Sequence, residues 1–148
     1  MRTPEWSREY RGELLGALAV AVATAVTWGA WLGWDREIQV FWPTGEVTGP
    51  FVAWQVIGCV LCLIAITVVG ALMLPPWIPP IALTVTFTAG WTWWVASTDY
   101  GFGLWLGGAP LVFVVMAIGS TLISAVTRAV AKSLSRLSAR TRREGLRR

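Results

Sequence analysis

The sequence contains no histidine and only two cysteines, and charged residues make up 14% of its 148 residues. Two cysteines alone cannot complete a tetrahedral metal site. Four long stretches also lack ionisable side chains apart from those thiols. Proton-coupled transporters and pumps keep such groups within the membrane, although inserting each one at mid-span costs roughly 2.5–3.5 kcal/mol. These absences disfavour coupled transport, and we expect no catalytic residue, no metal and no cofactor.

The same four stretches are the most informative feature that is present. They cover about residues 14–34, 51–74, 78–98 and 102–127, in a chain that is 55% hydrophobic. At about 1.5 Å per residue, each is long enough to cross a hydrocarbon core of about 30 Å. The sequence therefore predicts an all-α polytopic integral membrane protein, in which residues 1–148 form a single domain with four transmembrane helices.

Basic residues are concentrated at the two ends of the chain. Three precede the first stretch, only Arg36 lies between stretches, and eight follow the fourth. By the positive-inside rule, both termini should be cytoplasmic. This predicts a multi-pass protein of the cell (plasma) membrane, with an external loop at 35–50 and a basic cytoplasmic tail at 128–148.

Small residues recur every four positions in the first stretch, and residues at this spacing lie on one face of a helix. Such a row lets helix backbones approach closely in lipid, either within the chain or at a seam with a homodimer or membrane-protein partner. The row consists of Ala17, Ala21, Ala25, Gly29 and Gly33.

Triplets such as Ala19-Val20-Ala21 resemble signal-peptide cleavage sites. However, the apolar run continues to Trp34 and the segment before it is nearly neutral, so we expect an uncleaved helix.

Two connecting segments and one polar row complete the membrane part. Residues 35–50 combine β-branched and aromatic residues with turn signals, which leaves a short hairpin and an irregular connector both open. Four prolines within 74–80 predict a stiff cytoplasmic turn. Thr84, Thr88 and Thr92 form a stripe in the third stretch, which fits a packing face or, in an oligomer, the wall of a passive pore.

The tryptophans are unevenly placed, because the predicted topology puts nine of the eleven in the outer half of the membrane. Aromatic rings favour the interface between headgroups and tails. This distribution predicts an anchoring belt, with an aromatic-lined recess beneath the external loop as the alternative.

Cys59 and Cys62 are separated by two residues, which is the spacing of redox-active thiol pairs. Four spans, cytoplasmic termini and this pair in the second span resemble the bacterial disulfide-bond oxidases of the DsbB type, which would imply thiol oxidoreductase activity. That family needs a second cysteine pair and a basic residue soon after the first, and both are missing here. Because free cysteine behaves as a small hydrophobe, a packing role is the competing interpretation.

The tail carries basic residues every four positions, and Val126, Val130, Leu134 and Leu137 occupy a different face. The fourth helix should therefore continue as an amphipathic helix into the cytoplasm. Each basic residue near anionic lipid contributes about 1 kcal/mol of binding free energy, so we expect the tail to contact anionic headgroups. A docking tail for a partner protein is the alternative. No nucleic-acid partner is expected. The residues of this contact are Arg128, Lys132, Arg136 and Arg140.

Length and a tryptophan-rich, alanine-rich composition resemble uncharacterised small four-span integral membrane proteins of actinobacterial type, a resemblance that implies no activity. We expect a non-enzymatic accessory or scaffold component that acts through helix–helix and tail contacts. A membrane thiol oxidoreductase and a passive oligomeric pore are the two alternatives.

Overall fold

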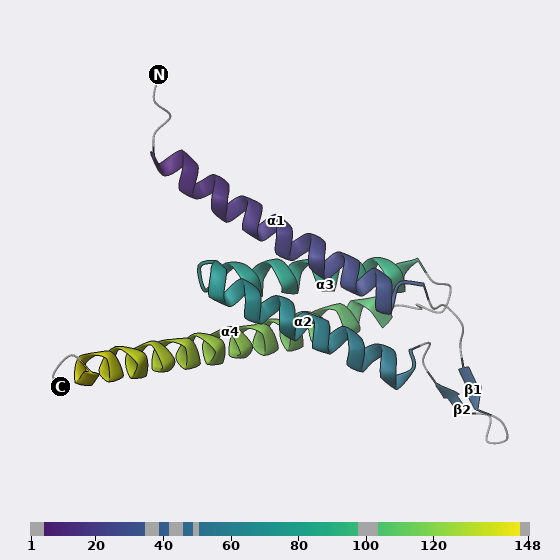
Figure 1. The fold of residues 1–148 in the computed structure, drawn as a ribbon. Coiled ribbons are helices and arrows are strands. Elements are labelled where there is room, and N and C mark those ends of the chain that lie inside the picture. The colour runs from purple at the N-terminus through teal and green to yellow at the C-terminus, as the bar shows by residue number, and fades with distance from the viewer. Residues whose placement is uncertain (1–4, 35–38, 42–45, 49–50, 98–103, 146–148) are drawn as a thin grey trace.

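The computed structural model describes residues 5–34, 39–41, 46–48, 51–97 and 104–145, with the side chains of 5–9, 39–41, 46–48, 104–105 and 140–145 left undescribed (Figure 1). Within these ranges the chain forms four helices and one hairpin. The helices are α1 (Glu5–Trp31), α2 (Ala53–Met73), α3 (Ile78–Ala96) and α4 (Leu104–Gly145). The strands β1 (Gln39–Phe41) and β2 (Glu46–Thr48) pair antiparallel, with Val40 opposite Val47. The loop at 35–50 thus contains the hairpin that the sequence left open.

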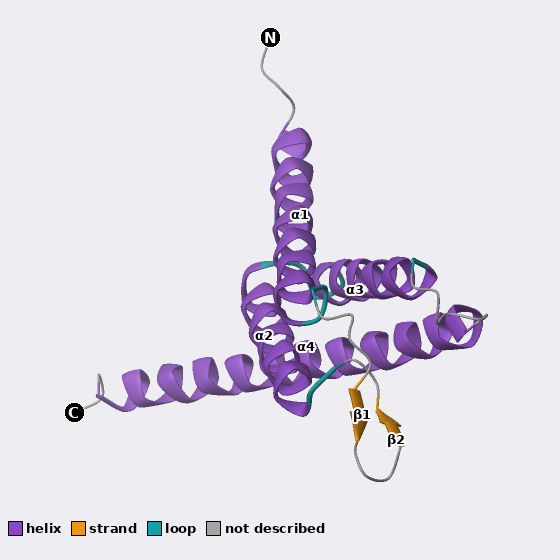
Figure 2. Cartoon of the chain, turned by 90° about the vertical axis from the view of Figure 1, so that its right-hand side faces the viewer, coloured by secondary structure: helices purple, strands orange, loops and turns teal. Residues whose placement is uncertain are grey.

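The four helices alternate in direction. The start of α1, the end of α4 and the α2–α3 turn lie towards one end of the bundle, and the hairpin lies at the other end (Figure 1). Helices α2 and α3 each pack against all three other helices, whereas α1 and α4 are not in contact over the described residues. In Figure 2, α1 runs steeply across the direction of α4. The bundle is therefore splayed, and α2 and α3 together link α1 to α4.

Three helices are long and apolar enough to cross a membrane, namely α1 from Tyr10, α2, and α4 between Leu106 and Ala139. The protein is thus a membrane-embedded helical protein. The sequence predicts four membrane-spanning helices, and among the described residues three helices meet the criteria of length and hydropathy. Helix α3 has 19 residues, but its two prolines, four threonines and three tryptophans lower its mean hydropathy.

The turn between α2 and α3 is built by proline. Leu74 ends α2 in an extended conformation, Pro75 and Pro76 follow, and α3 begins with proline in its first turn, where no amide donor is needed. The two helices meet closely there, because a Cβ on Gly70 would lie 3.1 Å from the ring of Pro79. Glycine at that position lets α3 fold back tightly on α2.

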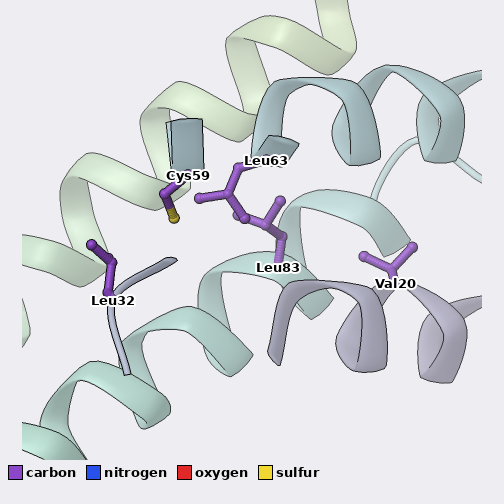
Figure 3. Packing of buried hydrophobic residues seen from close by; sticks show 5 residues of the cluster. All are labelled: Val20, Leu32, Cys59, Leu63 and Leu83. Carbon is purple, nitrogen blue, oxygen red and sulfur yellow. The ribbon is translucent and has the colours of Figure 1, made fainter. Parts of the chain in front are cut away.

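The buried centre is small and apolar. Val20 and Leu32 come from α1 and its end, Cys59 and Leu63 from α2, and Leu83 from α3 (Figure 3). Most other large apolar side chains are exposed, which suits a chain whose surface faces lipid rather than water. The few residues in this cluster fix the crossing point of α1, α2 and α3.

Helix α4 does not end where its apolar stretch ends. It runs unbroken for 42 residues, about 63 Å, and passes beyond Thr127 to Gly145. The sequence-based expectation that the fourth helix continues past the span therefore agrees with the structure. Helix α1 also extends beyond its apolar stretch, because it begins at Glu5, an extension that the sequence analysis did not predict.

Candidate functional site

Three tryptophans near the hairpin end of the bundle each seat against a glycine of a neighbouring helix. Trp31 of α1 lies against Gly58 of α2, where an added Cβ would be 2.5 Å from the indole ring. Trp91 of α3 lies at least as tightly on Gly108 of α4. Trp28 packs more loosely on Gly90 of α3, at 3.4 Å from the equivalent position. These tryptophan–glycine sockets join α2 to α1, α1 to α3, and α3 to α4.

Two further ring contacts reinforce the same layer. The rings of Trp31 and Trp54 meet edge to face, with centroids 5.9 Å apart, and Phe51 lies 5.1 Å from Trp94. Such pairs add about 0.5–1.5 kcal/mol beyond burial. Trp34, Trp54 and Trp93 are exposed and suited to an interfacial belt, whereas the socket tryptophans are half-buried between helices. The described tryptophans near the hairpin end therefore divide into a packing set and a surface set.

Buried polar groups lie along the same interfaces. The hydroxyls of Thr84 on α3 and Ser120 on α4 are 3.4 Å apart, and both residues are nearly inaccessible. Thr92 donates to the Thr88 carbonyl one turn back. The hydroxyls of Thr88 and Ser124 are buried without a hydrogen-bond partner. Thr84 of the threonine row therefore contacts α4, and the assignment of the row as a packing face or as a pore wall remains a prediction.

At the opposite end of the bundle, Leu74 forms a junction of three helices. Its carbonyl, left free by the end of α2, accepts a hydrogen bond from the half-buried guanidinium of Arg128 on α4. A cation at a helix C-terminus also interacts favourably with the helix dipole. On the other side, a Cβ on Gly16 of α1 would clash with the side chain of Leu74. Arg128, Leu74 and Gly16 define what we call the inner junction.

The predicted small-residue row lies beside the closest-packed face of α1 rather than on it. The face that α1 packs against α2 and α3 carries Gly16, Val20, Thr24 and Leu32. In the predicted row, Ala17 and Ala21 line a groove beside α3, Ala25 is exposed, a Cβ on Gly29 would meet nothing within 4 Å, and Gly33 contacts Gly29 and Trp28.

That groove has a volume of about 600 Å³ and is almost entirely apolar. Tyr10, Glu13 and Leu18 of α1 line one wall, and Ile81 and Val85 of α3 line the other. It lies where α1 diverges from the bundle, towards the end that carries the α2–α3 turn. The splay of α1 and α3 is therefore what opens it.

The two cysteines remain free thiols in α2. Cys59 is 2% exposed and belongs to the buried cluster, beside Leu63 and Leu83 (Figure 3), whereas Cys62 is half-buried. Among the described residues no group of three histidine, cysteine or carboxylate side chains gathers as metal ligands would. The redox interpretation of Cys59 and Cys62 stays a prediction.

Gln55 has a role that the sequence did not reveal. Its side-chain oxygen accepts a hydrogen bond of 2.8 Å from the amide of Val52, which is the N-cap of α2. Gln55 is 1% exposed, and its bond satisfies a backbone donor at the start of α2 that no carbonyl within the helix can reach. The sequence signal that could have revealed this capping role is a glutamine three residues after the start of a helix.

The four predicted lipid-contact residues do not share one environment. Arg128 is half-buried at the inner junction, and its Nε–H is buried without a partner. Lys132 and Arg136 are exposed on the part of α4 that extends beyond the bundle, and the side chain of Arg140 lies outside the described residues. Arg128 is therefore in contact with the bundle itself.

The fold and these sites define the class as a membrane-embedded bundle with a long protruding helix. No protein-family model, curated protein or solved structure matches the chain. Any functional conclusion must therefore come from the geometry described above.

Proposed function

We propose that the protein is a non-enzymatic accessory or scaffold component of the plasma membrane, which acts through helix–helix and tail contacts. One observation carries this proposal. The face of α1 that packs within the chain leaves Ala25 and Gly29 of the small-residue row uncovered, with open space at the Cβ position of Gly29. Small residues favour close helix approach in lipid, so this row suits a second transmembrane helix.

The proposal includes a topology. In this topology α3 also crosses the membrane and brings the number of spans from three to four. Its 19 residues extend about 28 Å, and it lies between α1 and α4. Both termini then lie in the cytoplasm with the basic tail, and the hairpin lies outside. The start of α1 and the end of α4 lie at the same end of the bundle, which supports this arrangement (Figure 1).

Photo-crosslinking in intact membranes tests the proposal. A photoreactive amino acid at Ala25 or Gly29 is expected to trap a discrete dimer or a single partner. Ala19 and Ala30 are the matched controls, because both are exposed and lie on a different side of the same helix. These two positions should give no discrete product.

Two results would count against the scaffold function. One is monomer alone at both Ala25 and Gly29. The other is the same set of products at all four positions, since random collision in the bilayer does not depend on the helix face.

A further inference from the structure

The groove between α1 and α3 has the size of a site for a small molecule. Its volume of about 600 Å³ lies within the range of about 300–1,000 Å³ that ligand sites usually have. The lining residues recur at spacings of three and four on both helices, from Tyr10 to Ala21 on α1 and from Trp77 to Thr86 at the start of α3. Each helix therefore presents one continuous face to the groove.

The charged and aromatic residues of the groove lie at one end. Tyr10 and Glu13 stand where the membrane-spanning part of α1 begins, and Trp77 is the N-cap of α3. Tyr10 and Trp77 are exposed, and aromatic side chains of this kind are typical of a membrane interface. Glu13 is half-buried and is the one charged side chain among the described residues that line the groove. This end therefore lies at the level of lipid headgroups.

The other end of the groove lies within the hydrocarbon of the same leaflet. Glu13 and Ala21 are about 12 Å apart along α1, which is less than half of a 30 Å hydrocarbon core. Leu18, Ile81 and Val85 are each more than half exposed, so the walls are open sideways to lipid. A molecule in the bilayer can therefore enter the groove without passing through water.

The groove does not continue into the second leaflet. Further along α1 and α3 the two helices are in contact, where Trp28 packs on Gly90. Figure 1 shows α1 diverging from α3 on the side of this contact that leads to the start of α1. A transmembrane helix needs a groove across both leaflets, whereas a single acyl chain needs only one. The shape therefore favours a lipid.

The polar groups at the headgroup end select the kind of lipid. The Glu13 carboxylate accepts hydrogen bonds, whereas the Tyr10 hydroxyl and the Trp77 indole N–H can donate them. Phosphatidylethanolamine carries both complements, a primary ammonium group and a phosphate. The trimethylated ammonium group of phosphatidylcholine has no N–H to donate, and the headgroup of phosphatidylglycerol has no cation to face a carboxylate.

We infer that this groove holds one phospholipid with a primary-amine headgroup, phosphatidylethanolamine. Its ammonium group pairs with Glu13, its phosphate accepts hydrogen bonds from Tyr10 and Trp77, and one acyl chain lies along Ala17 and Ala21. The small side chains at those two positions leave space for the chain. The inference goes beyond the scaffold function and does not depend on it, because the uncovered part of the small-residue row lies outside the groove.

Native mass spectrometry of the full chain tests the inference. The chain is released from detergent micelles that contain equal amounts of phosphatidylethanolamine and phosphatidylcholine with the same acyl chains, and the lipids that stay bound are counted. We expect one retained phosphatidylethanolamine, preferred about three- to fivefold over phosphatidylcholine, as a partly exposed charged contact provides.

Charge variants test the headgroup contact. Glu13→Gln should reduce the preference for phosphatidylethanolamine to near one. Glu13→Lys should remove it and favour phosphatidylglycerol when that lipid is added to the micelles. Arg11→Gln is the matched control, because Arg11 is exposed on a different side of α1, and it should leave the preference unchanged.

Filling the groove tests the position of the acyl chain. Ala17→Phe with Ala21→Phe should lower the retention of both lipids at least about tenfold, because the rings occupy the space of several methylene groups. Ala19→Phe with Ala30→Phe is the matched control, since both positions are exposed on a different side of the same helix. Far-UV circular dichroism should show the same thermal midpoint for the two double variants.

Three outcomes would overturn the inference. One is equal retention of the two lipids by the parent chain. Another is a preference for phosphatidylethanolamine that survives Glu13→Gln. The third is unchanged retention when phenylalanine fills the groove at Ala17 and Ala21, which would place the bound lipid elsewhere on the bundle.

Discussion

Gly58→Ala is expected to lower the free energy of unfolding by about 1–3 kcal/mol, the usual cost of overpacking. The new methyl group would lie 2.5 Å from the ring of Trp31, which must then move. Trp31 is in edge contact with Trp54 and packs against the buried cluster, so the ring has little room to do so. Thermal unfolding of the purified chain in detergent, followed by far-UV circular dichroism, measures the effect.

A double-mutant cycle isolates the socket. In a Trp31→Ala background the clash is gone, so Gly58→Ala should then be neutral or slightly stabilising, as alanine usually is in a helix. Gly119→Ala is the matched control in α4, because a Cβ there meets nothing within 4 Å. If Gly58→Ala lowers the free energy of unfolding equally with and without Trp31, glycine is not needed at this position to make room for the indole ring.

Arg128→Ala is expected to destabilise the chain by about 1.5–3 kcal/mol, the range for a hydrogen bond to a charged group. The substitution removes the donor to the Leu74 carbonyl and the positive charge at the C-terminus of α2. Lys132→Ala removes one positive charge a turn further along, where the side chain is exposed. It should cost little in the same unfolding assay.

The comparison of these two variants decides between the roles given to Arg128. A structural role predicts a clear difference between Arg128→Ala and Lys132→Ala in detergent without anionic lipid. Equal stability of both variants would contradict the inner junction and return Arg128 to the lipid-contact group.

The existence of the helices could be predicted from sequence, because lipid-spanning segments are local runs of apolar residues. The residues at which the helices begin and end could not be predicted. Hydropathy marks where a helix enters hydrocarbon, whereas backbone hydrogen bonding continues through polar residues, as in α1 before Leu14 and in α4 after Thr127. The strands at 39–41 and 46–48 were left open because their turn signals also suit an irregular loop.

The packing details depend on which helices meet, and this information is not local. The small-residue row was chosen by size alone, yet the closest seam of α1 lies one residue earlier, where Gly16 meets Leu74. Thr24 fits that seam because its hydroxyl bonds the Val20 carbonyl within the same helix. The sockets likewise require knowing that Trp31 faces α2 and Trp91 faces α4.

Arg128 shows the same limit in a charged residue. The sequence grouped it with Lys132, Arg136 and Arg140 by spacing. The acceptor that holds it is a carbonyl that becomes free only because α2 ends before Pro75. The spacing of basic residues could not identify an acceptor 54 positions away.

The proposed topology, with both termini in the cytoplasm, depends on α3 crossing the membrane, which cysteine accessibility tests most directly. In a Cys59→Ala, Cys62→Ala background, single cysteines replace Ser7, Thr48 or Ser135, and intact cells are treated with a membrane-impermeant maleimide. The account predicts labelling at Thr48→Cys in intact cells, and at Ser7→Cys and Ser135→Cys only after permeabilisation. Labelling of Ser135→Cys in intact cells, with Ser7→Cys still protected, would mean three spans and an external tail.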